Sequence, residues 1–498
     1  MTRTTLSLIA AATALVAVTG VASLTVPGDA APAASAGAPA RLPVERSTLL
    51  CPGAGLSDLS ETTYTAVTPG GEGTGDGAAK LSAALKAGQT EPAAKPLATL
   101  KEAGKPVYVE TDKANAPAVI GDAEKGMAPG FAVQQTTEID AGAGRGLLGA
   151  RCTAPDTEFW FPAVSLAEDR QDHVYLTNPD DAGAVVDLEL YGPEGLISDA
   201  DGEQQVPGHG SSSVLLSTLT DEPLELVTLK VTVRSGRVGA AVRATDDKLG
   251  GDWLQPAADP AAQVVLPGIP KDATSVRLVA FAPGDQDAEL GIKYSGPTGQ
   301  ITPAGNETLT VKSGMTASVD FTGLTAGEGG SLILRPAEGS TAPVVAALRV
   351  TRGKGANQET AFIPATEAIA ERATAAGSWA VSGKAGGTTL ALTAPDAEVK
   401  VKVTATDGSK GGTRTEKTYT VKAGTTLTPT DLPVPDGKLG TGRYALTVEK
   451  LSGGDLYAAR MLEQKKDGVP MFTVQTLPDD HGTVAVPKTR QDISLLGD

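Results

Sequence analysis

Residues 227–234 read VTLKVTVR, and in this segment apolar side chains alternate with polar ones. In an extended chain, successive side chains point to opposite faces, so the four apolar residues share one face and the polar residues share the other. This pattern predicts an antiparallel strand with one buried and one hydrated face. The same alternation recurs at 186–190, 399–404 and 444–448.

Strands of this kind follow one another from Phe159 to the end of the chain. Asn-Pro, Asp-Gly and Gly-Gly pairs lie between them, and such pairs are typical of turns. Only Ala365–Ala373 has a helical pattern in this part of the sequence. The low aromatic content of 4% indicates cores built from Val, Leu, Ala and Thr.

The strand-rich part also repeats itself. Four landmarks recur in the same order: a proline turn, a glycine turn, a valine before a second glycine turn, and a small-residue strand that carries an arginine. The proline turns are at Pro179, Pro283 and Pro395, and the arginines are Arg243, Arg349 and Arg460. The period of about 105–110 residues is the size of a β-sandwich domain. We therefore expect three tandem copies of one all-β module.

Residues 47–153 look different. Leucines at helical spacing predict short helices at Ala79–Lys86 and Pro96–Ala103, and two apolar runs predict strands at Pro106–Glu110 and Phe131–Ile139. The expected fold class is therefore mainly β, with three tandem β-sandwich modules after a small mixed α/β N-terminal domain. The expected boundaries are 1–26 for an export segment, 27–46 for a Pro/Ala/Gly linker, 47–153 for the mixed domain, and 154–258, 259–365 and 366–498 for the modules.

The N-terminus predicts export. Arg3 precedes an uncharged, largely apolar run from Leu6 to Val26, which is the pattern of a secretory signal. The run is also long enough to span a bilayer. Cleavage after the small residues around Ala34–Ala36 and retention as a membrane anchor both remain open. In either case we expect the rest of the chain outside the cytoplasm, in the medium or on the outer face of the membrane.

The two cysteines of the chain, Cys51 and Cys152, bracket the N-terminal region. Exported proteins usually meet an oxidising compartment, and an even cysteine count permits one bridge. The sequence therefore predicts a Cys51–Cys152 disulfide.

Charge and motif content exclude several kinds of function. The net charge of −17 argues against a nucleic-acid partner, because phosphate binding needs a basic face. Gly144–Gly149 matches G-x-G-x-x-G but runs into a strand-like end, so we interpret it as a turn and expect no cofactor. His209 precedes three serines inside a recurring turn, and we interpret it as a hairpin. We expect no metal site, although calcium binding by the acidic loops at 178–181, 199–203 and 246–252 stays open.

Four aromatic residues flank the first strand-rich module: Phe159, Trp160, Phe161 and Trp253. Exposed aromatic rings bind sugars and peptides, so these side chains are candidate ligand contacts. In a chain so poor in aromatics, they more often fill a core or a joint between domains, because each ring buries about 150–250 Å². The sequence favours packing and leaves binding as the alternative.

Several of these blocks also carry a family resemblance. The sequences CPG at 51–53, RC at 151–152, FWF at 159–161, LTNP at 176–179 and DWL at 252–254 resemble a family of exported actinobacterial proteins catalogued as a domain of unknown function. The resemblance implies export and a cell-envelope setting. It implies no activity and supplies no catalytic residues.

Together these features predict a non-enzymatic exported scaffold or interaction protein of the cell envelope. Its expected partner is an envelope protein or a polysaccharide, and its expected contact with the membrane is limited to the N-terminal segment. Two alternatives are a carbohydrate-binding protein that uses the aromatic residues, and an envelope hydrolase with a concealed pair of carboxylates.

Overall fold

The computed structural model describes residues 40–54, 59–71, 74–85, 95–112, 114, 116–198, 203–379, 387–437 and 442–486. These residues fall into two compact units. The small unit combines the two ends of the described chain, and the large unit is Pro43–Gly482. Strands β1 (Ala40–Pro43) and β36 (Thr483–Val486) pair with each other in a two-stranded sheet. The predicted export segment lies outside the described residues.

The described residues are strands joined by turns, with one short 3-10 turn at Leu216–Thr218 and no α-helix. The mixed α/β N-terminal domain is therefore a wrong prediction. The first predicted helix overlaps strand β4 (Gly77–Ala83), and the second contains strand β5 (Ala98–Leu100). The predicted helix at Ala365–Ala373 is also absent, and β28 (Arg372–Trp379) begins where that helix would end.

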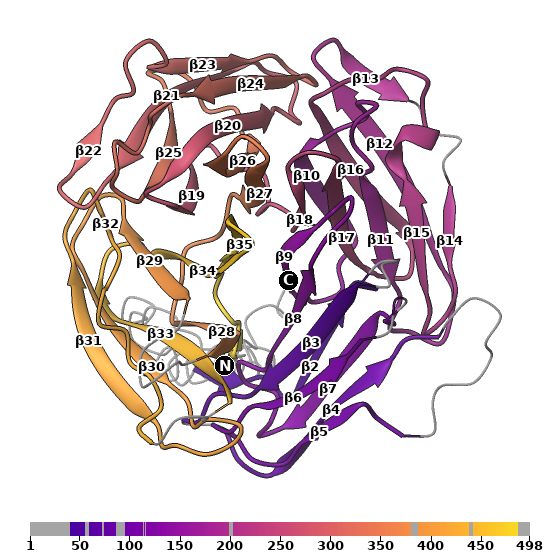
Figure 1. Ribbon diagram of the computed structural model, residues 1–498, viewed down its shortest axis with the longest axis vertical. Coiled ribbons are helices and arrows are strands. Elements are labelled where there is room, and N and C mark those ends of the chain that lie inside the picture. Colours follow the sequence, from indigo (N-terminus) through magenta and orange to yellow (C-terminus); the bar gives the residue numbers. More distant parts are fainter. Residues whose placement is uncertain are drawn as a thin grey trace, which may run out of the picture. The chain divides into compact units, whose positions relative to one another are not determined.

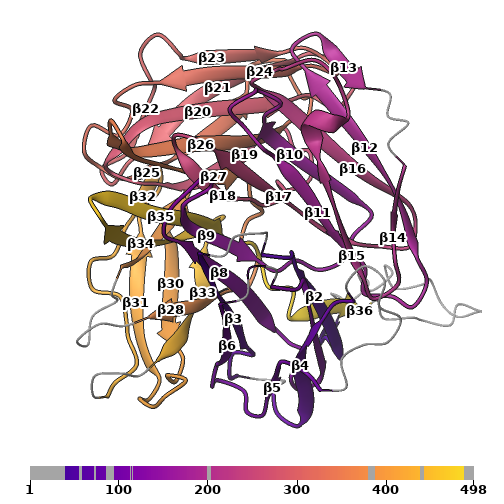
Figure 2. The ribbon, with the colours of Figure 1, turned by 45° about the vertical axis from the view of Figure 1, so that its right-hand side comes forward.

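In the large unit, the described strands form four β-sandwiches, each made of two antiparallel sheets (Figures 1 and 2). Sandwich 1 comprises β2 (Arg46–Cys51), β3 (Ser60–Val67), β4, β5, β6 (Val107–Thr111), β7 (Val119–Lys125), β8 (Ala132–Ile139) and β9 (Gly146–Arg151). Sandwich 2 comprises β10 (Glu158–Val164), β11 (His173–Thr177), β12 (Ala184–Gly192), β13 (Gly195–Ser198), β14 (Gln204–Val206), β15 (Ser211–Leu215), β16 (Val227–Ser235), β17 (Gly239–Asp246) and β18 (Gly250–Leu254).

The remaining two sandwiches follow in the same way. Sandwich 3 comprises β19 (Val264–Ile269), β20 (Ala273–Phe281), β21 (Ala288–Ser295), β22 (Gln300–Ile301), β23 (Thr308–Val311), β24 (Thr316–Phe321), β25 (Gly330–Pro336), β26 (Val345–Lys354) and β27 (Asn357–Pro364). Sandwich 4 comprises β28, β29 (Thr388–Ala394), β30 (Val399–Ala405), β31 (Thr415–Val421), β32 (Thr425–Leu427), β33 (Arg443–Gly453), β34 (Tyr457–Lys466) and β35 (Val469–Thr476).

All four sandwiches have the same strand order. If the strands of each copy are numbered along the chain, one sheet has the order 1-6-3-4 and the other has the order 5-2-7-8. In sandwiches 2 and 3 the fourth position is divided between two short strands that both pair with the third strand. The N-terminal region is therefore a fourth copy of the module that the sequence predicts three times.

The recurring landmarks lie at equivalent places in sandwiches 2, 3 and 4. Pro179, Pro283 and Pro395 each lie between the second and third strands. The three arginines lie on the seventh strand, opposite a residue of the eighth: Arg243 opposite Trp253, Arg349 opposite Phe362, and Arg460 opposite Gln475. The repeat predicted from these landmarks therefore agrees with the strand topology.

The strand β16 shows how the alternating pattern builds a core. Val227, Leu229 and Val231 are fully buried, whereas the side chain of Lys230 stays partly exposed. The three apolar side chains pack with residues of the facing sheet, such as Val174 and Leu176 of β11. The apolar face of this sheet is thus covered by the partner sheet of the same sandwich.

The eighth strands of the four sandwiches contact one another: β9 with β18, β18 with β27, β27 with β35, and β35 with β9. Figure 1 shows these four strands together in the middle of the unit. We call this meeting of eighth strands the hub. The two ends of the unit are also joined, because the backbone N–H of Val44 donates to the carbonyl of Gly482 (3.1 Å).

Among the described residues, no helix has the length and apolar character needed to cross a bilayer.

Candidate functional site

The four candidate aromatic residues are all buried. Phe159 and Phe161 point into the core of sandwich 2. Trp160 lies on the other face of β10 and packs on Phe281 of sandwich 3, with ring centroids 5.4 Å apart. Its indole N–H donates to Glu158 (3.0 Å). These rings thus fill a core and the joint between sandwiches 2 and 3, so they do not form an exposed binding surface.

Trp253 lies in the hub on β18. Its ring packs edge-on against Tyr175, with centroids 5.2 Å apart, and contacts Ile139, Leu148 and Ala150 of sandwich 1. The side chain is 1% exposed. This tryptophan therefore joins sandwich 1 to sandwich 2 and is not available to a ligand.

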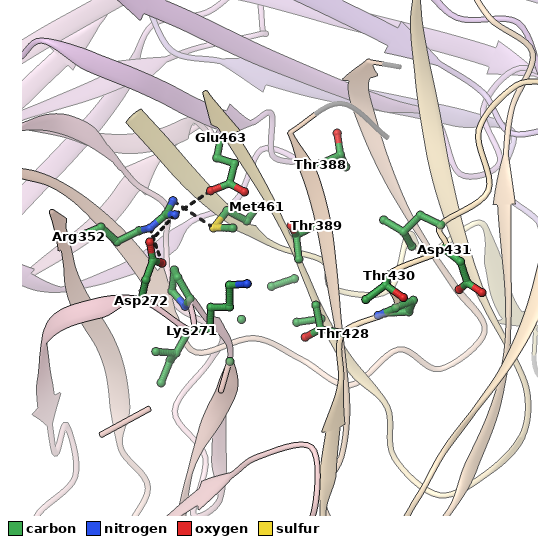
Figure 3. Close-up of a pocket in the computed structure, with 18 residues that line it drawn as sticks. Lys271, Asp272, Arg352, Thr388, Thr389, Thr428, Thr430, Asp431, Met461 and Glu463 are labelled. Atoms are coloured by element: carbon green, nitrogen blue, oxygen red, sulfur yellow. Dashed lines mark hydrogen bonds and ion pairs between the residues drawn. The ribbon is translucent and has the colours of Figure 1, made fainter. Parts of the chain in front are cut away.

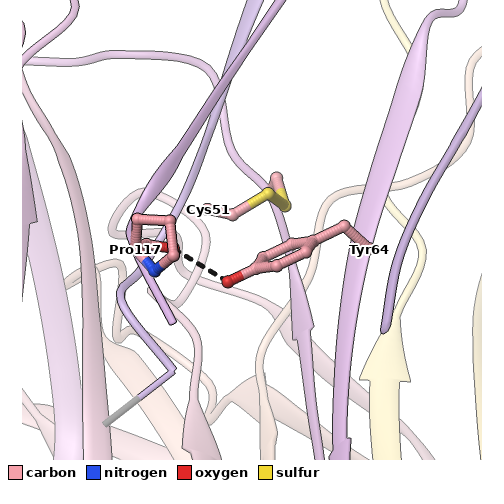
Figure 4. The surroundings of a disulfide bond; sticks show 4 residues. Cys51, Tyr64 and Pro117 are labelled. Carbon is pink, nitrogen blue, oxygen red and sulfur yellow. Dashed lines mark hydrogen bonds between the residues drawn. A yellow bond between two sulfur atoms is a disulfide. The ribbon is translucent and has the colours of Figure 1, made fainter. Parts of the chain in front are cut away.

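The predicted disulfide is confirmed: Cys51 and Cys152 are bonded, with their Cα atoms 4.4 Å apart. Cys51 ends the first strand of sandwich 1, and Cys152 follows the eighth, so the bond closes the sandwich at its two ends. Tyr64 lies against this bond, and its hydroxyl donates to the carbonyl of Pro117 at 2.8 Å (Figure 4). Burial raises the pKa of the Tyr64 hydroxyl, so it stays protonated as a donor.

The hub contains two buried carboxyl groups from different sandwiches. Asp252 on β18 accepts hydrogen bonds at Oδ1 from the backbone N–H of Gly149 (3.0 Å) and the hydroxyl of Thr473 (3.1 Å). Burial raises its pKa well above the usual value, and the charge of Glu359 adds to the rise, although the hydrogen bonds oppose it. Asp252 therefore connects sandwich 2 with sandwiches 1 and 4.

Glu359 on β27 plays the same part for sandwich 3. Its Oε1 accepts from the backbone N–H groups of Leu147 (3.1 Å) and Phe472 (3.3 Å), which belong to sandwiches 1 and 4. Burial raises its pKa to about 7, against the opposing effect of these two donors and of Arg145 and Arg352. The second oxygen of each hub carboxyl, Asp252 Oδ2 and Glu359 Oε2, has no hydrogen-bond partner among the described residues.

A chain of side-chain hydrogen bonds extends the hub into sandwich 4. Arg460, which is fully buried, donates to Gln475 Oε1 (2.6 Å) and to the carbonyl of Ala376 (2.5 Å). Gln134 of sandwich 1 also donates to Gln475 Oε1 (3.2 Å), and Gln475 in turn donates to Thr473 (3.1 Å). Gln134 thus links sandwich 1 to sandwich 4, whereas the bonds of Arg460 and the bond from Gln475 to Thr473 lie within sandwich 4.

A cleft of ≈ 790 Å³ lies between sandwiches 3 and 4 (Figure 3). One wall is the end of β19 with the turn that follows it, Gly268–Asp272. The floor is the outer face of β29 and β34, where Thr389 pairs with Met461 and Ala391 pairs with Ala459. The segment Thr428–Leu432 after β32 forms the other wall.

The charged groups of this cleft are mostly neutralised. Arg352 donates to Asp272 through two nitrogens (2.8 Å each) and to Glu463 (2.7 Å), as Figure 3 shows. Asp431 accepts from Lys417, which lowers the pKa of its carboxyl. Lys271 extends into the cleft, and no described residue forms an ion pair with it.

The remaining candidate motifs are turns. His209 lies in the turn between β14 and β15, and its Nε2 is 2.6 Å from Asp181 Oδ1, while Ser211 begins β15. Gly144–Gly149 runs into β9, so no helix follows it as a dinucleotide site requires. Asp180 is paired with Arg237 (2.9 Å). Residues 199–202 lie outside the described residues. Among the described residues, no group of three or more acidic, histidine or cysteine side chains could hold a metal ion.

Sequence reasoning missed the functional features of both the hub and the cleft. Asp252 is part of the DWL block, but an aspartate beside a tryptophan gives no local sign of burial between domains. Glu359 and Lys271 lie next to turns, where charged residues are ordinary. Glu359 could have been found from its position on an eighth strand, because the eighth strands form the hub. The hub itself can be recognised only once sandwich 1 is known to be a fourth copy of the module.

The chain was compared with known families. The family model that covers residues 107–430 is described as a family of unknown function, DUF5719. A search of the curated proteins finds no match.

Proposed function

The chain belongs to this family of unknown function, DUF5719, and from its geometry we propose that it is a non-enzymatic, exported interaction protein that serves as a scaffold at the cell envelope. The scaffold is the unit of four β-sandwiches. Its partner is an envelope protein or a polysaccharide that binds the outer surfaces of the sandwiches.

One observation carries this proposal: the polar groups of the hub are used to join the sandwiches. Asp252 and Glu359 bind backbone N–H groups of neighbouring sandwiches, and Gln134 of sandwich 1 donates to Gln475 of sandwich 4. Trp160 and Trp253 fill joints. A chain that buries its carboxyl groups and aromatic rings between domains gains a fixed arrangement of surfaces, which is what a scaffold needs.

The cleft between sandwiches 3 and 4 supports an interaction role. It offers the Lys271 ammonium, threonine hydroxyls and an apolar floor of Ala391, Ala459 and Met461. Such a mixed surface can hold a polar chain with apolar segments. Because the aromatic candidates are buried, the carbohydrate-binding alternative that depends on them loses its support.

Two features support export. The segment from Arg3 to Val26 has the sequence pattern of a secretory signal, and the Cys51–Cys152 disulfide is of the kind that persists in an oxidising compartment.

A photo-crosslinking experiment in the native host tests the proposal. A crosslinking amino acid replaces Lys271 in the cleft, and in a matched control it replaces the exposed Lys312 of sandwich 3. We expect the full chain in the envelope or medium fraction, and a discrete adduct from position 271 that position 312 does not give. Recovery of the chain in the cytosol, or equal adducts from both positions, would overturn the proposal.

A further inference from the structure

The three recurring arginines of the seventh strands have different surroundings. Arg460 is fully buried and bonded to Gln475 and Ala376. Arg243 is also buried, opposite Trp253 in the hub. Arg349 of sandwich 3 instead lines a cavity. The repeat therefore places one arginine of the three at an accessible site.

This cavity has a volume of ≈ 790 Å³ and is distinct from the cleft that contains Lys271. Three sandwiches contribute to it through the hairpins that precede their eighth strands. Sandwich 1 contributes Arg145, sandwich 2 contributes Asp246–Leu249, and sandwich 3 contributes Gly355–Gln358. Arg145 fixes these hairpins by donating to the carbonyls of Lys248 (3.1 Å), Ala356 (3.2 Å) and Gln358 (2.8 Å).

The guanidinium of Arg349 is poorly satisfied. Its side chain is only 15% exposed, and its one ion pair is with Glu225, whose Oε1 lies 3.6 Å from Nη2. That distance is too long for a hydrogen bond, and no described residue accepts one from this side chain. A guanidinium has five N–H donors. Arg349 therefore has free donors that face the cavity.

The charges around Arg349 are of both signs. Burial lowers the pKa of Arg349 and the nearby Arg170 and Arg277 lower it further, whereas Glu225 and Asp246 raise it. Arg170 is bonded to Asp172 (2.8 and 3.1 Å), and Arg277 is bonded to Asp320 and Glu225. Arg170 and Arg277 are thus each hydrogen-bonded to a carboxylate. Arg349 has only a longer ion pair with Glu225, which is already bonded to Arg277.

Four acidic residues line the cavity: three of them have partners, and the fourth is the exposed Asp247. Asp246 accepts the backbone N–H groups of Lys248 and Leu249 (2.8 Å each), and Asp169 lies 3.6 Å from the Lys248 ammonium. Glu225 is the carboxylate that competes for Arg349, and its side chain is 58% exposed. Because Glu225 is largely exposed and already bonded to Arg277, a ligand can take its place beside Arg349.

We propose that this cavity binds a small ligand through an oxyanion group, a carboxylate or a phosphate, which Arg349 holds with two parallel N–H donors. The planar fork of arginine matches the two oxygens of such a group. The whole chain carries a net charge of −17, which repels extended polyanions. The site therefore fits a molecule, or the end of a chain, with one acidic group.

Titration calorimetry on the purified full-length protein tests this site with two probes, inorganic phosphate and glucuronate. We expect saturable binding of at least one probe, and the probe that binds identifies the acidic group. The substitution Arg349→Gln should weaken this binding at least tenfold. Arg335→Gln is the matched control, because Arg335 lies in the same sandwich and is paired with Asp396 outside the cavity (2.5 Å). Binding of neither probe, or equal loss in both variants, would overturn the proposal.

A second variant keeps the test decisive if Arg349→Gln does not fold. Glu225→Gln removes the competing carboxylate, so it should tighten binding of the same probe. Unchanged or weaker binding in this variant would count against the site. Arg349→Lys keeps the charge but loses the two-donor geometry, and we expect binding intermediate between the wild type and Arg349→Gln.

Discussion

At the scale of single residues, the Cys51–Cys152 disulfide is a covalent cross-link between the two ends of sandwich 1. It closes a loop of about 100 residues, for which the chain-entropy model gives a stabilisation of about 4.7 kcal/mol. We expect Cys152→Ser, or reduction of the wild type, to lower the free energy of unfolding by about 3–5 kcal/mol. Denaturant unfolding with and without reductant measures this. The Cys152→Ser protein is the control, because reductant should not change its midpoint. Equal midpoints for the oxidised and reduced wild type would contradict the prediction.

Glu359 gives the hub a dependence on pH. Its pKa is about 7 in the folded protein against 4.5 for the free side chain, so the folded state binds the proton more tightly. Stability from this group is therefore fully present below about pH 4.5 and is lost as the pH rises to 7, by at most about 3 kcal/mol. Because glutamine resembles the protonated carboxyl, Glu359→Gln should be more stable than the wild type at pH 8 and equal to it at pH 4.

Thermal unfolding of Glu359→Gln and wild type across this pH range measures the difference. The exposed Glu338→Gln serves as the control and should follow the wild type. A Glu359→Gln protein that is less stable than the wild type at pH 8 would contradict the prediction, because it would mean that the hub favours the charged carboxyl over a neutral group.

The disulfide and Glu359 also show what local sequence can predict. The disulfide follows from the cysteine count, since two cysteines allow only one intramolecular bond. The role of Glu359 does not follow, because its burial depends on Leu147 and Phe472, which lie far away in the sequence. No local pattern reports that a turn-side carboxylate will be enclosed by two other domains.

At the scale of single elements, β9 shows why a glycine is required in the hub. A Cβ on Gly149 would lie 1.5 Å from Gln475 Nε2 and 2.7 Å from the side chain of Thr473. Gln475 cannot move aside easily, because Arg460 and Gln134 both hold its carbonyl oxygen. We expect Gly149→Ala to lower the free energy of unfolding by about 3 kcal/mol through this steric conflict.

Chemical denaturation of Gly149→Ala measures the effect. Gly75→Ala is the matched control, because nothing lies within 4 Å of its added Cβ, and it should differ little from the wild type. If both variants unfold at the same denaturant concentration, the close packing of β9 against β35 does not limit stability.

The elements of sandwich 1 were also the hardest to predict. In β4, Ala79 and Leu81 are buried at a spacing of two, but Leu81 and Leu85 also fit a helical spacing of four. Alanine is compatible with both structures, so a short segment rich in alanine does not decide between them. In β16, four β-branched or leucine residues alternate with polar ones, and the prediction of a strand was correct. The strand β16 could be predicted because it is longer than β4 and is rich in β-branched residues, whereas β4 has none.

At the scale of the whole molecule, the topology identifies a relation that the sequence landmarks do not. Sandwich 1 has the strand order of the other three, and Pro69 lies between its second and third strands, yet its seventh strand, β8, carries no arginine. The landmarks mark turns and one strand, whereas the fold depends on alternating apolar faces that many sequences satisfy. A copy that keeps the faces and only some of the landmarks is therefore easily missed in a search for landmarks.

The hub predicts that the unit Pro43–Gly482 unfolds as one cooperative body rather than as four independent domains. In a simple tandem array, each domain can unfold alone. Here Asp252 and Glu359 accept hydrogen bonds from sandwich 1. If one sandwich unfolded alone, these bonds would break. The chain has three tryptophans that report on different places. Trp160 lies between sandwiches 2 and 3, Trp253 lies in the hub, and Trp379 lies in sandwich 4.

Three variants, each with one tryptophan retained and the other two replaced by phenylalanine, measure this cooperativity by fluorescence during denaturant unfolding. Coincident transitions within each variant, by fluorescence and by circular dichroism, are expected, because the local probe and the whole fold should lose structure together. Circular dichroism also controls for the stability lost in each substitution. A Trp379 signal that changes at a lower denaturant concentration than the dichroism of the same protein would show that sandwich 4 unfolds alone. The hub would then be a contact between independent domains, and it would not fix the arrangement of surfaces on which the scaffold proposal depends.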